Sequence, residues 1–177
     1  KLSDIQILAF EPNPIVAKKY KHNLSLNPEL NNIIQLYPIG LGNKKEEREL
    51  AYDDSNTGAG RVTHEKATNK TTVTIERLDD LMLKLNPPKI AFIKLIVEGF
   101  EPEVFKGGWN TIIKYKPPIF FEVTPAWWKE NNATIEEILD KLRVLGYRFM
   151  IEHHNEMLLY EPSKFVARTQ FNLLATV

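Results

Sequence analysis

Four acidic residues of this sequence come at or just after the end of a short apolar segment. They are Glu11, Glu98, Glu101 and Glu122. If the apolar segments are parallel strands, their carboxyl ends meet at one edge of a sheet, which is where ligands bind in open α/β sheets. Carboxylates at this edge can accept hydrogen bonds from hydroxyl groups, take up a proton as general bases, or bind a cation. The acids are therefore candidates for a site, provided that the elements around them form such a sheet.

The apolar patterns around these acids alternate between strands and helices. Short runs rich in β-branched residues predict strands, and apolar residues at i, i+4 spacing predict helices between them. Strands are expected at residues 5–10, 33–39, 48–52, 71–75, 90–97, 119–123, 147–151, 156–160 and 171–176. Helices are expected after Asn13, from Asp79 through Leu85, past Gly99 and after Thr134. The polar residues 53–60 show no periodicity and are expected to form a loop.

Capping residues support the helix predictions. Asn13 is a good N-cap, and Pro14 suits the first helical position because its missing N–H would have no partner there. Thr134 and Glu137 have the spacing of a capping box. Asp79 is expected to cap the short helix that follows it. Local signals therefore fix where three of the helices begin.

The order of the elements indicates the fold class. Alternating strands and helices imply βαβ units joined by right-handed crossovers. The expected fold is α/β, with a doubly wound, mostly parallel sheet and antiparallel strands at the C-terminal end. No repeat or linker divides the chain, so residues 1–177 are expected to form a single domain.

Composition excludes several classes of function. The 23 basic and 23 acidic residues balance, so the basic excess typical of nucleic-acid-binding proteins is missing. There is no cysteine and no His-x-x-x-His motif, so no metal site is expected. No apolar segment approaches the ~20 residues of a membrane span, and no signal-peptide pattern is present. We expect a cytoplasmic protein without a nucleic-acid or membrane partner, and a homo-oligomer stays open.

Glu11 has the most specific expected role among the four acids. A carboxylate directly after a strand is placed to accept hydrogen bonds from both hydroxyls of a ribose, with Asn13 and its helix N-terminus alongside. The alternative is a capping acid near a helix start, which the helix dipole favours.

Two aromatic pairs also leave alternatives open. Trp127 and Trp128 could stack on a sugar or planar acceptor, or could cover the edge of the sheet. His153 and His154 follow a predicted strand, where one could act as a base near neutral pH or both could be ordinary surface residues. Adjacent strand residues point to opposite faces, so at most one histidine is expected to face a site.

A family resemblance is carried by two motifs. Residues 9–14 read Ala-Phe-Glu-Pro-Asn-Pro, and residues 93–101 read Ile-Lys-Leu-Ile-Val-Glu-Gly-Phe-Glu. Together they resemble motifs of the FkbM family of S-adenosylmethionine-dependent methyltransferases, and residues 171–174 resemble its closing strand. The resemblance implies the methyltransferase version of the Rossmann fold, S-adenosylmethionine as the cofactor, and methyl transfer to a hydroxyl oxygen of a sugar or another small molecule.

The resemblance also implies roles for single residues. It places Ile39 and Gly40 against the adenine ring, where a glycine permits close approach, although a plain turn glycine is the alternative. Asn56 and Gly58 match a family loop, with a simple turn as the alternative. The candidates for cofactor binding are Glu11, Asn13, Ile39, Gly40, Asn56 and Gly58.

The acceptor side of the reaction is implied for the remaining acids. The resemblance places Glu98, Glu101 and Glu122 near the acceptor, with Glu122 matching an acid of a family segment that begins at Pro118. They are the candidate catalytic residues. The alternative for Glu98 and Glu101 is a solvated pair at a helix entry, which the helix dipole also favours.

Two departures from the family pattern keep a second interpretation open. Ile96 stands where the family has an acid, and isoleucine can neither hold a cation nor accept a proton. The first strand and its glycine-rich turn, which normally hold the amino-acid end of the cofactor, do not precede Glu11. We expect that the polypeptide extends upstream, that its N-terminal residues are arranged differently, or that another chain fills the space. The second interpretation is a degenerate methyltransferase-like scaffold that acts in binding or assembly.

Overall fold

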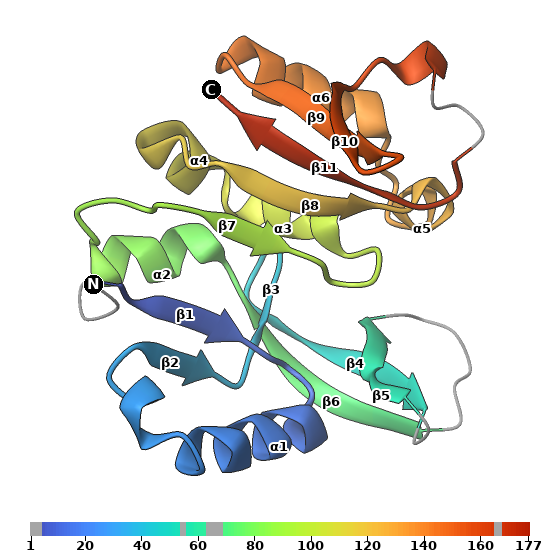
Figure 1. Cartoon of the computed structure of the whole chain (residues 1–177). Coiled ribbons are helices and arrows are strands. Elements are labelled where there is room, and N and C mark those ends of the chain that lie inside the picture. The colour runs from blue at the N-terminus through green and yellow to red at the C-terminus, as the bar shows by residue number, and fades with distance from the viewer. Residues whose placement is uncertain (1–4, 54–55, 63–68, 165–167) are drawn as a thin grey trace. The chain divides into compact units, whose positions relative to one another are not determined.

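The structure is a computed structural model, and it describes residues 5–53, 56–62, 69–164 and 168–177 (Figure 1). The chain divides into two compact units, Lys1–Glu76 and Arg77–Val177. These are called the N-terminal unit and the C-terminal unit, and each is described by itself. The expectation of a single domain stays a prediction.

The N-terminal unit contains a parallel strand pair and a four-stranded sheet. The pair is β1–β2, and the sheet has the order β3-β6-β4-β5. In this sheet β3 runs parallel to β6, whereas β4 runs antiparallel to both β5 and β6. The elements are β1 (Ile7–Phe10), α1 (Pro14–Ser25), a 3-10 turn (Pro28–Leu30), β2 (Ile34–Tyr37), β3 (Gly40–Leu41), β4 (Glu46–Asp53), β5 (Asn56–Val62) and β6 (Asn69–Glu76).

The C-terminal unit is built on a five-stranded sheet with the order β10-β9-β11-β8-β7. Only β7 and β8 run parallel to each other in it, and the ladders β8–β11, β11–β9 and β9–β10 are antiparallel. The strands are β7 (Ile93–Leu95), β8 (Ile119–Val123), β9 (Arg148–His153), β10 (Glu156–Leu159) and β11 (Phe171–Thr176). The helices are α2 (Leu78–Leu85), α3 (Glu101–Gly107), α4 (Trp109–Tyr115), α5 (Pro125–Glu130) and α6 (Ile135–Val144), with a 3-10 turn at Pro162–Lys164.

These elements confirm the α/β class and the antiparallel C-terminal strands. The expectation of a mostly parallel sheet fits loosely, because antiparallel ladders outnumber parallel ones among the described strands. The cause is local in each unit. Strands β4 and β5 pair as antiparallel neighbours and β6 pairs with the other side of β4, while β11 returns between β8 and β9.

The predicted helix caps are confirmed at two helices and wrong at a third. The Asn13 side chain accepts a hydrogen bond from the Ile15 N–H at 3.0 Å, and Thr134 with Glu137 forms a capping box. Asp79 instead lies inside α2, where its carboxylate accepts hydrogen bonds from the side chain and N–H of Asn110 and of Thr111. Asp79 therefore caps the N-terminus of α4, because the chain folds back so that the start of α4 lies against α2.

Three further expectations are corrected by the structure. Residues 53–60 do not form a loop throughout, since β5 covers Asn56–Val62 and pairs with β4. The strand expected at 90–97 is only β7, Ile93–Leu95. The helix expected past Gly99 breaks into α3 and α4 at Gly108, where a Cβ atom would lie 2.9 Å from Leu78 Cδ2. Gly108 thus permits close packing against α2.

The core of the C-terminal unit lies on the helix-covered face of β8. Ile119, Phe121 and Val123 alternate along this face and have no exposed surface. The Phe121 ring contacts the Phe105 ring edge-on at 5.2 Å and stacks on the Trp128 ring at 6.3 Å between centroids. This packing fixes α3 and α5 over the sheet, and with them the residues that follow β7 and β8.

Candidate functional site

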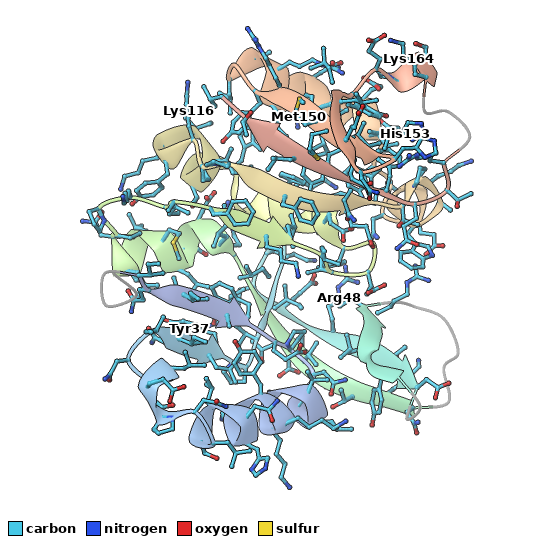
Figure 2. The ribbon with its side chains drawn as sticks, viewed as in Figure 1. Tyr37, Arg48, Lys116, Met150, His153 and Lys164 are labelled. Atoms are coloured by element: carbon cyan, nitrogen blue, oxygen red, sulfur yellow. The ribbon has the colours of Figure 1, made fainter. Side chains whose placement is uncertain are left out.

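In the N-terminal unit, Glu11 directly follows β1. Its N–H donates to the carbonyl oxygen of Tyr37 at 3.0 Å, which extends the β1–β2 pairing by one step. Figure 2 labels Tyr37 at this pair of strands. The Glu11 carboxylate accepts a hydrogen bond from the Asn13 N–H through Oε1 at 2.8 Å. Among the described residues, none donates a hydrogen bond to the other oxygen, Oε2. The acid is therefore held at the start of α1 with one oxygen available to a ligand.

Partial burial affects the ionisation of Glu11. Desolvation raises the pKa of the carboxyl above its ordinary value, and the hydrogen bond from the Asn13 N–H opposes this effect. A half-buried carboxylate with a spare acceptor oxygen gains more from a neutral hydroxyl donor than a fully solvated one, because less water competes for it. This arrangement suits recognition of a diol.

Gly40 lies at the same carboxyl end of the β1–β2 pair as Glu11. A Cβ atom on Gly40 would approach Pro12 Cβ to 3.4 Å and Ile75 Cδ1 to 2.6 Å. A side chain at this position would push the buried Ile75 side chain aside, so glycine suits the close approach of the chain to the loop after β1 and to strand β6. Glu11 and Gly40 thus lie at the ends of two paired strands in one unit, and their role in cofactor binding stays a prediction.

The other cofactor candidates differ in what the structure says of them. Asn13 is 2% exposed and acts as the cap of α1. Ile39 is half-buried next to Gly40. Asn56 and Gly58 lie on β5, and their side-chain surroundings fall outside the described residues. Cofactor binding by these residues stays a prediction.

In the C-terminal unit, the turn after β7 is held against α5. Glu98 and Gly99 both have positive φ, 52° and 93°. A Cβ atom on Gly99 would lie 2.6 Å from Trp127 Cβ, an atom too close to the backbone to move away easily. The Asn131 side chain also donates to the Gly99 carbonyl oxygen at 3.0 Å. The positive φ and the nearby Trp127 side chain therefore favour glycine at position 99.

Glu101 lies beneath this turn with no exposed surface. Its Oε1 accepts a hydrogen bond from the Val97 N–H at 2.8 Å, and its Oε2 accepts one from the Trp128 indole N–H at 3.1 Å. Burial raises the pKa of Glu101 to about 7; the hydrogen bonds oppose this shift and the nearby Glu122 carboxylate adds to it. Glu101 thus links the turn to α5, and its role in catalysis stays a prediction.

Glu122 and Thr124 provide unsatisfied polar atoms at the carboxyl end of β8. Glu122 is 7% exposed and accepts a hydrogen bond from the Gln170 side chain through Oε1 at 2.8 Å. Its Oε2 and the hydroxyl of Thr124 are buried without a partner among the described residues. Thr124 continues β8 in an extended conformation, with φ −120° and ψ 94°, so its side chain lies on the same face as that of Glu122. Leaving such groups unpaired costs about 1–3 kcal/mol each, which a bound hydroxyl would recover.

Ile96 occupies the position next to Glu122. The last registered pair between β7 and β8 is Leu95 with Phe121, so Ile96 and Glu122 are the residues that follow. Ile96 is 37% exposed, which is unusual for an apolar side chain at a strand end. The isoleucine therefore adds no carboxylate to Glu122 and Glu101 at this point.

The tandem histidines and tryptophans are also placed by the structure. His153, labelled in Figure 2, ends β9. His154 has a φ of 52° in the following turn, and the two rings lie 4.1 Å apart between centroids. The expectation that they point to opposite faces is wrong, because His154 is not in the strand. Trp128 is buried as a core residue and a donor to Glu101, whereas Trp127 packs on Gly99.

Sequence reasoning did not find Thr124 or Gln170 as site residues. Thr124 directly follows β8, and a polar residue two positions after Glu122 was the signal available for it. Gln170 precedes β11, and its distance from Glu122 along the chain hides the contact. Among the described residues, no cluster of three or more metal-ligating side chains occurs.

The described elements form an α/β protein that carries acidic residues at or just after the ends of the strands β1, β7 and β8. Residues 3–149 match the methyltransferase FkbM domain family, and the chain belongs to this family. The crystal structure of methyltransferase FkbM from Methylobacillus flagellatus KT has a similar fold, with a TM-score of 0.57 and 16% sequence identity. The match covers 97% of this chain and 36% of that chain, so this chain spans about a third of that protein's length. No protein with a curated function matches the sequence significantly.

These comparisons confirm the family predicted from the two motifs. Membership in a methyltransferase family implies a methyl donor. Within the part of the chain that the structure describes, no helix combines the length and the apolar character that crossing a membrane requires.

Proposed function

We propose that this chain is an S-adenosylmethionine-dependent methyltransferase domain that acts on a hydroxyl group of a sugar or another small molecule. The observation that carries the proposal is the position of Glu11 beside Gly40 at the carboxyl end of the β1–β2 pair. A carboxylate oxygen to which none of the described residues donates a hydrogen bond fits the ribose hydroxyls of the cofactor. Gly40 lets the chain after β2 pack closely on Pro12, the residue that follows this acid. S-adenosylmethionine, when bound, supplies an electrophilic methyl group.

The residues of the C-terminal unit support the choice of a hydroxyl acceptor. Glu122 Oε2 can accept a hydrogen bond from an acceptor hydroxyl and then its proton, which is the action of a general base. The Thr124 hydroxyl can orient the same group, because a hydroxyl both donates and accepts hydrogen bonds. Glu101 holds the turn at Gly99 in place, and Glu98 stays a candidate at this turn.

Cofactor binding is tested by calorimetry with S-adenosylmethionine and S-adenosylhomocysteine. We expect micromolar binding by the natural sequence and a loss of about tenfold or more in Glu11→Gln, since the amide presents a donor in place of one carboxylate oxygen. Glu29→Gln, an exposed acid of the same unit, is the matched control. Absence of heat at high protein concentration would contradict the proposal.

The second candidate function is a non-catalytic scaffold of the same family. Ile96 favours it, because an apolar residue occupies a strand end where the family pattern has an acid. A scaffold predicts no binding of either nucleoside and no effect of Glu11→Gln. Binding of S-adenosylhomocysteine that depends on Glu11 decides for the enzyme.

A further inference from the structure

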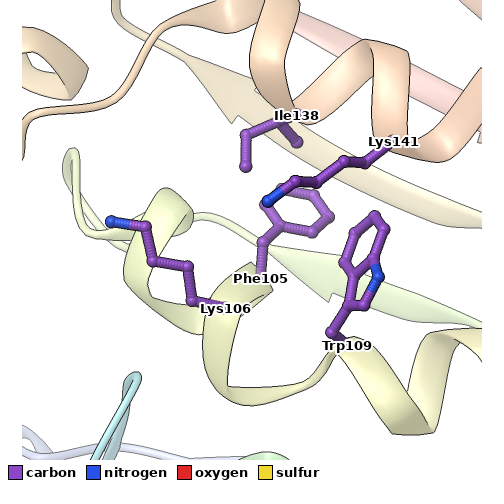
Figure 3. Close-up of a pocket in the computed structure, with 5 residues that line it drawn as sticks. All are labelled: Phe105, Lys106, Trp109, Ile138 and Lys141. Carbon is purple, nitrogen blue, oxygen red and sulfur yellow. The ribbon is translucent and has the colours of Figure 1, made fainter.

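A separate groove of the C-terminal unit lies between α3, α4 and α6, away from the strand ends described above (Figure 3). Its volume is about 210 Å³. The lining residues come from three helices and combine two aromatic rings, one aliphatic side chain and two lysines. They are Phe105, Lys106, Trp109, Ile138 and Lys141.

The break between α3 and α4 creates the apolar part of this groove. Phe105 belongs to the core and is 1% exposed, so its ring forms a fixed floor. Trp109 begins α4 directly after Gly108 and is half-buried. Figure 3 shows the Trp109 side chain beside the Phe105 ring, with Ile138 of α6 opposite. A flat apolar group would therefore meet ring surfaces and an aliphatic wall.

The polar groups at the groove are donors and cations. The Lys141 ammonium lies 5.9 Å from the centre of the Trp109 ring and forms no ion pair with a described residue. Lys106 pairs with Glu103, its Nζ 2.5 Å from Oε1. The Trp109 indole N–H donates to none of the described residues, and no carboxylate lines the groove. One cation and one N–H donor thus have no anionic partner here.

We propose that this groove binds a small organic anion with a flat apolar body, such as an aromatic carboxylate. The apolar body would lie on Phe105 and Trp109, and the carboxylate would accept a hydrogen bond from Lys141 Nζ. Charge-assisted hydrogen bonds to a partly desolvated anion are the stronger class of such bonds. The competing explanation is that the aliphatic stem of Lys141 covers apolar surface while its ammonium stays in water.

The proposal is tested with benzoate as the probe and 5-fluorotryptophan incorporated into the full chain. The three tryptophans give separate ¹⁹F resonances, and Trp109→Phe assigns the one at the groove. We expect a saturable shift of the Trp109 resonance with benzoate and none at the other two. The dissociation constant should rise about tenfold in Lys141→Gln, and should also rise with added salt.

Controls make each outcome decisive. Lys84→Gln removes an exposed lysine of α2 and should leave benzoate binding unchanged. Benzyl alcohol, the neutral counterpart of the probe, should shift the Trp109 resonance much less than benzoate. No saturable shift up to about 20 mM benzoate, an equal affinity in Lys141→Gln, or an equal response to benzyl alcohol would each overturn the proposal. Because none of these readouts uses S-adenosylmethionine, the result is independent of the proposed methyl transfer.

Discussion

The buried acid Glu101 predicts how the stability of this protein depends on pH. Its pKa is about 7 in the folded chain, against an ordinary value of 4.5. The folded state therefore keeps a proton that the unfolded chain loses between pH 4.5 and 7. Folding stability from this group is full below pH 4.5, falls as the pH rises through this window, and is constant above about pH 7.

The size of the effect follows from the difference between the two pKa values. A difference of two to three pH units at 1.36 kcal/mol per unit corresponds to a loss of about 3 kcal/mol in the free energy of unfolding. Most of this loss falls between pH 5 and pH 8. No solvent screening reduces it, because Glu101 has no exposed surface.

Glu101→Gln is the substitution that isolates this contribution. Glutamine has nearly the same shape but does not titrate, so the pH dependence from this site disappears. At pH 5 the variant should be less stable by about 1–3 kcal/mol, because its amide nitrogen cannot accept a hydrogen bond from the Val97 N–H or the Trp128 indole. By pH 8 the difference from the natural sequence should shrink by about 2–3 kcal/mol or change sign.

Urea denaturation of both proteins at several pH values between 5 and 8 measures this difference. Taking the difference between the two proteins removes the titration of all other groups. Glu156→Gln, which changes an exposed acid of the same unit, should show no such trend. If the stability difference between the natural sequence and Glu101→Gln is the same at pH 5 and at pH 8, the assigned protonation of Glu101 is wrong.

Three further predictions concern the elements around the two sites. Urea denaturation should show that Gly99→Ala lowers the free energy of unfolding by about 1–3 kcal/mol more than Gly146→Ala. Both glycines have φ near 95°, but only Gly99 faces a tightly packed side chain. Equal losses in the two variants would contradict the packing argument. Asp79→Ala should lower the free energy of unfolding by about 1–3 kcal/mol, whereas Asp80→Ala, at an exposed position of the same helix, should change it little. A similar loss in both variants would exclude a stabilising role for Asp79 as the cap of α4. If the rest of the site is intact, Ile96→Asp should increase the transfer of radiolabelled methyl groups from S-adenosylmethionine to hydroxyl compounds. No increase would count against our placement of the end of β7.

The sequence by itself was enough for the features that depend on neighbouring residues. The start of α1 follows from Asn13 and Pro14, and the start of α6 follows from Thr134 and Glu137, because a capping hydrogen bond closes within one helical turn. The limits of β8 and β11 also match the predicted segments, 119–123 and 171–176. The two motifs predicted the family for the same reason, since each is a contiguous strand end.

Some failed predictions involve residues whose partners lie far away in the chain. Asp79 looked like a local cap, yet its hydrogen bonds go to Asn110 and Thr111, because the fold brings α4 onto α2. Residues 53–60 looked like a loop, yet β5 forms there because β4 offers a strand to pair with. Local patterns carry no information about such partners.

The chemistry of the acids was decided by the tertiary structure. Sequence could place Glu11, Glu101 and Glu122 at strand ends, but the three carboxylates there have different surroundings. Trp128 and the Val97 N–H occupy both oxygens of Glu101, whereas Glu122 keeps one buried oxygen without a partner among the described residues. Solvation and hydrogen-bond partners set how a carboxyl ionises and what it can bind, and both are properties of the packed chain rather than of any segment of it.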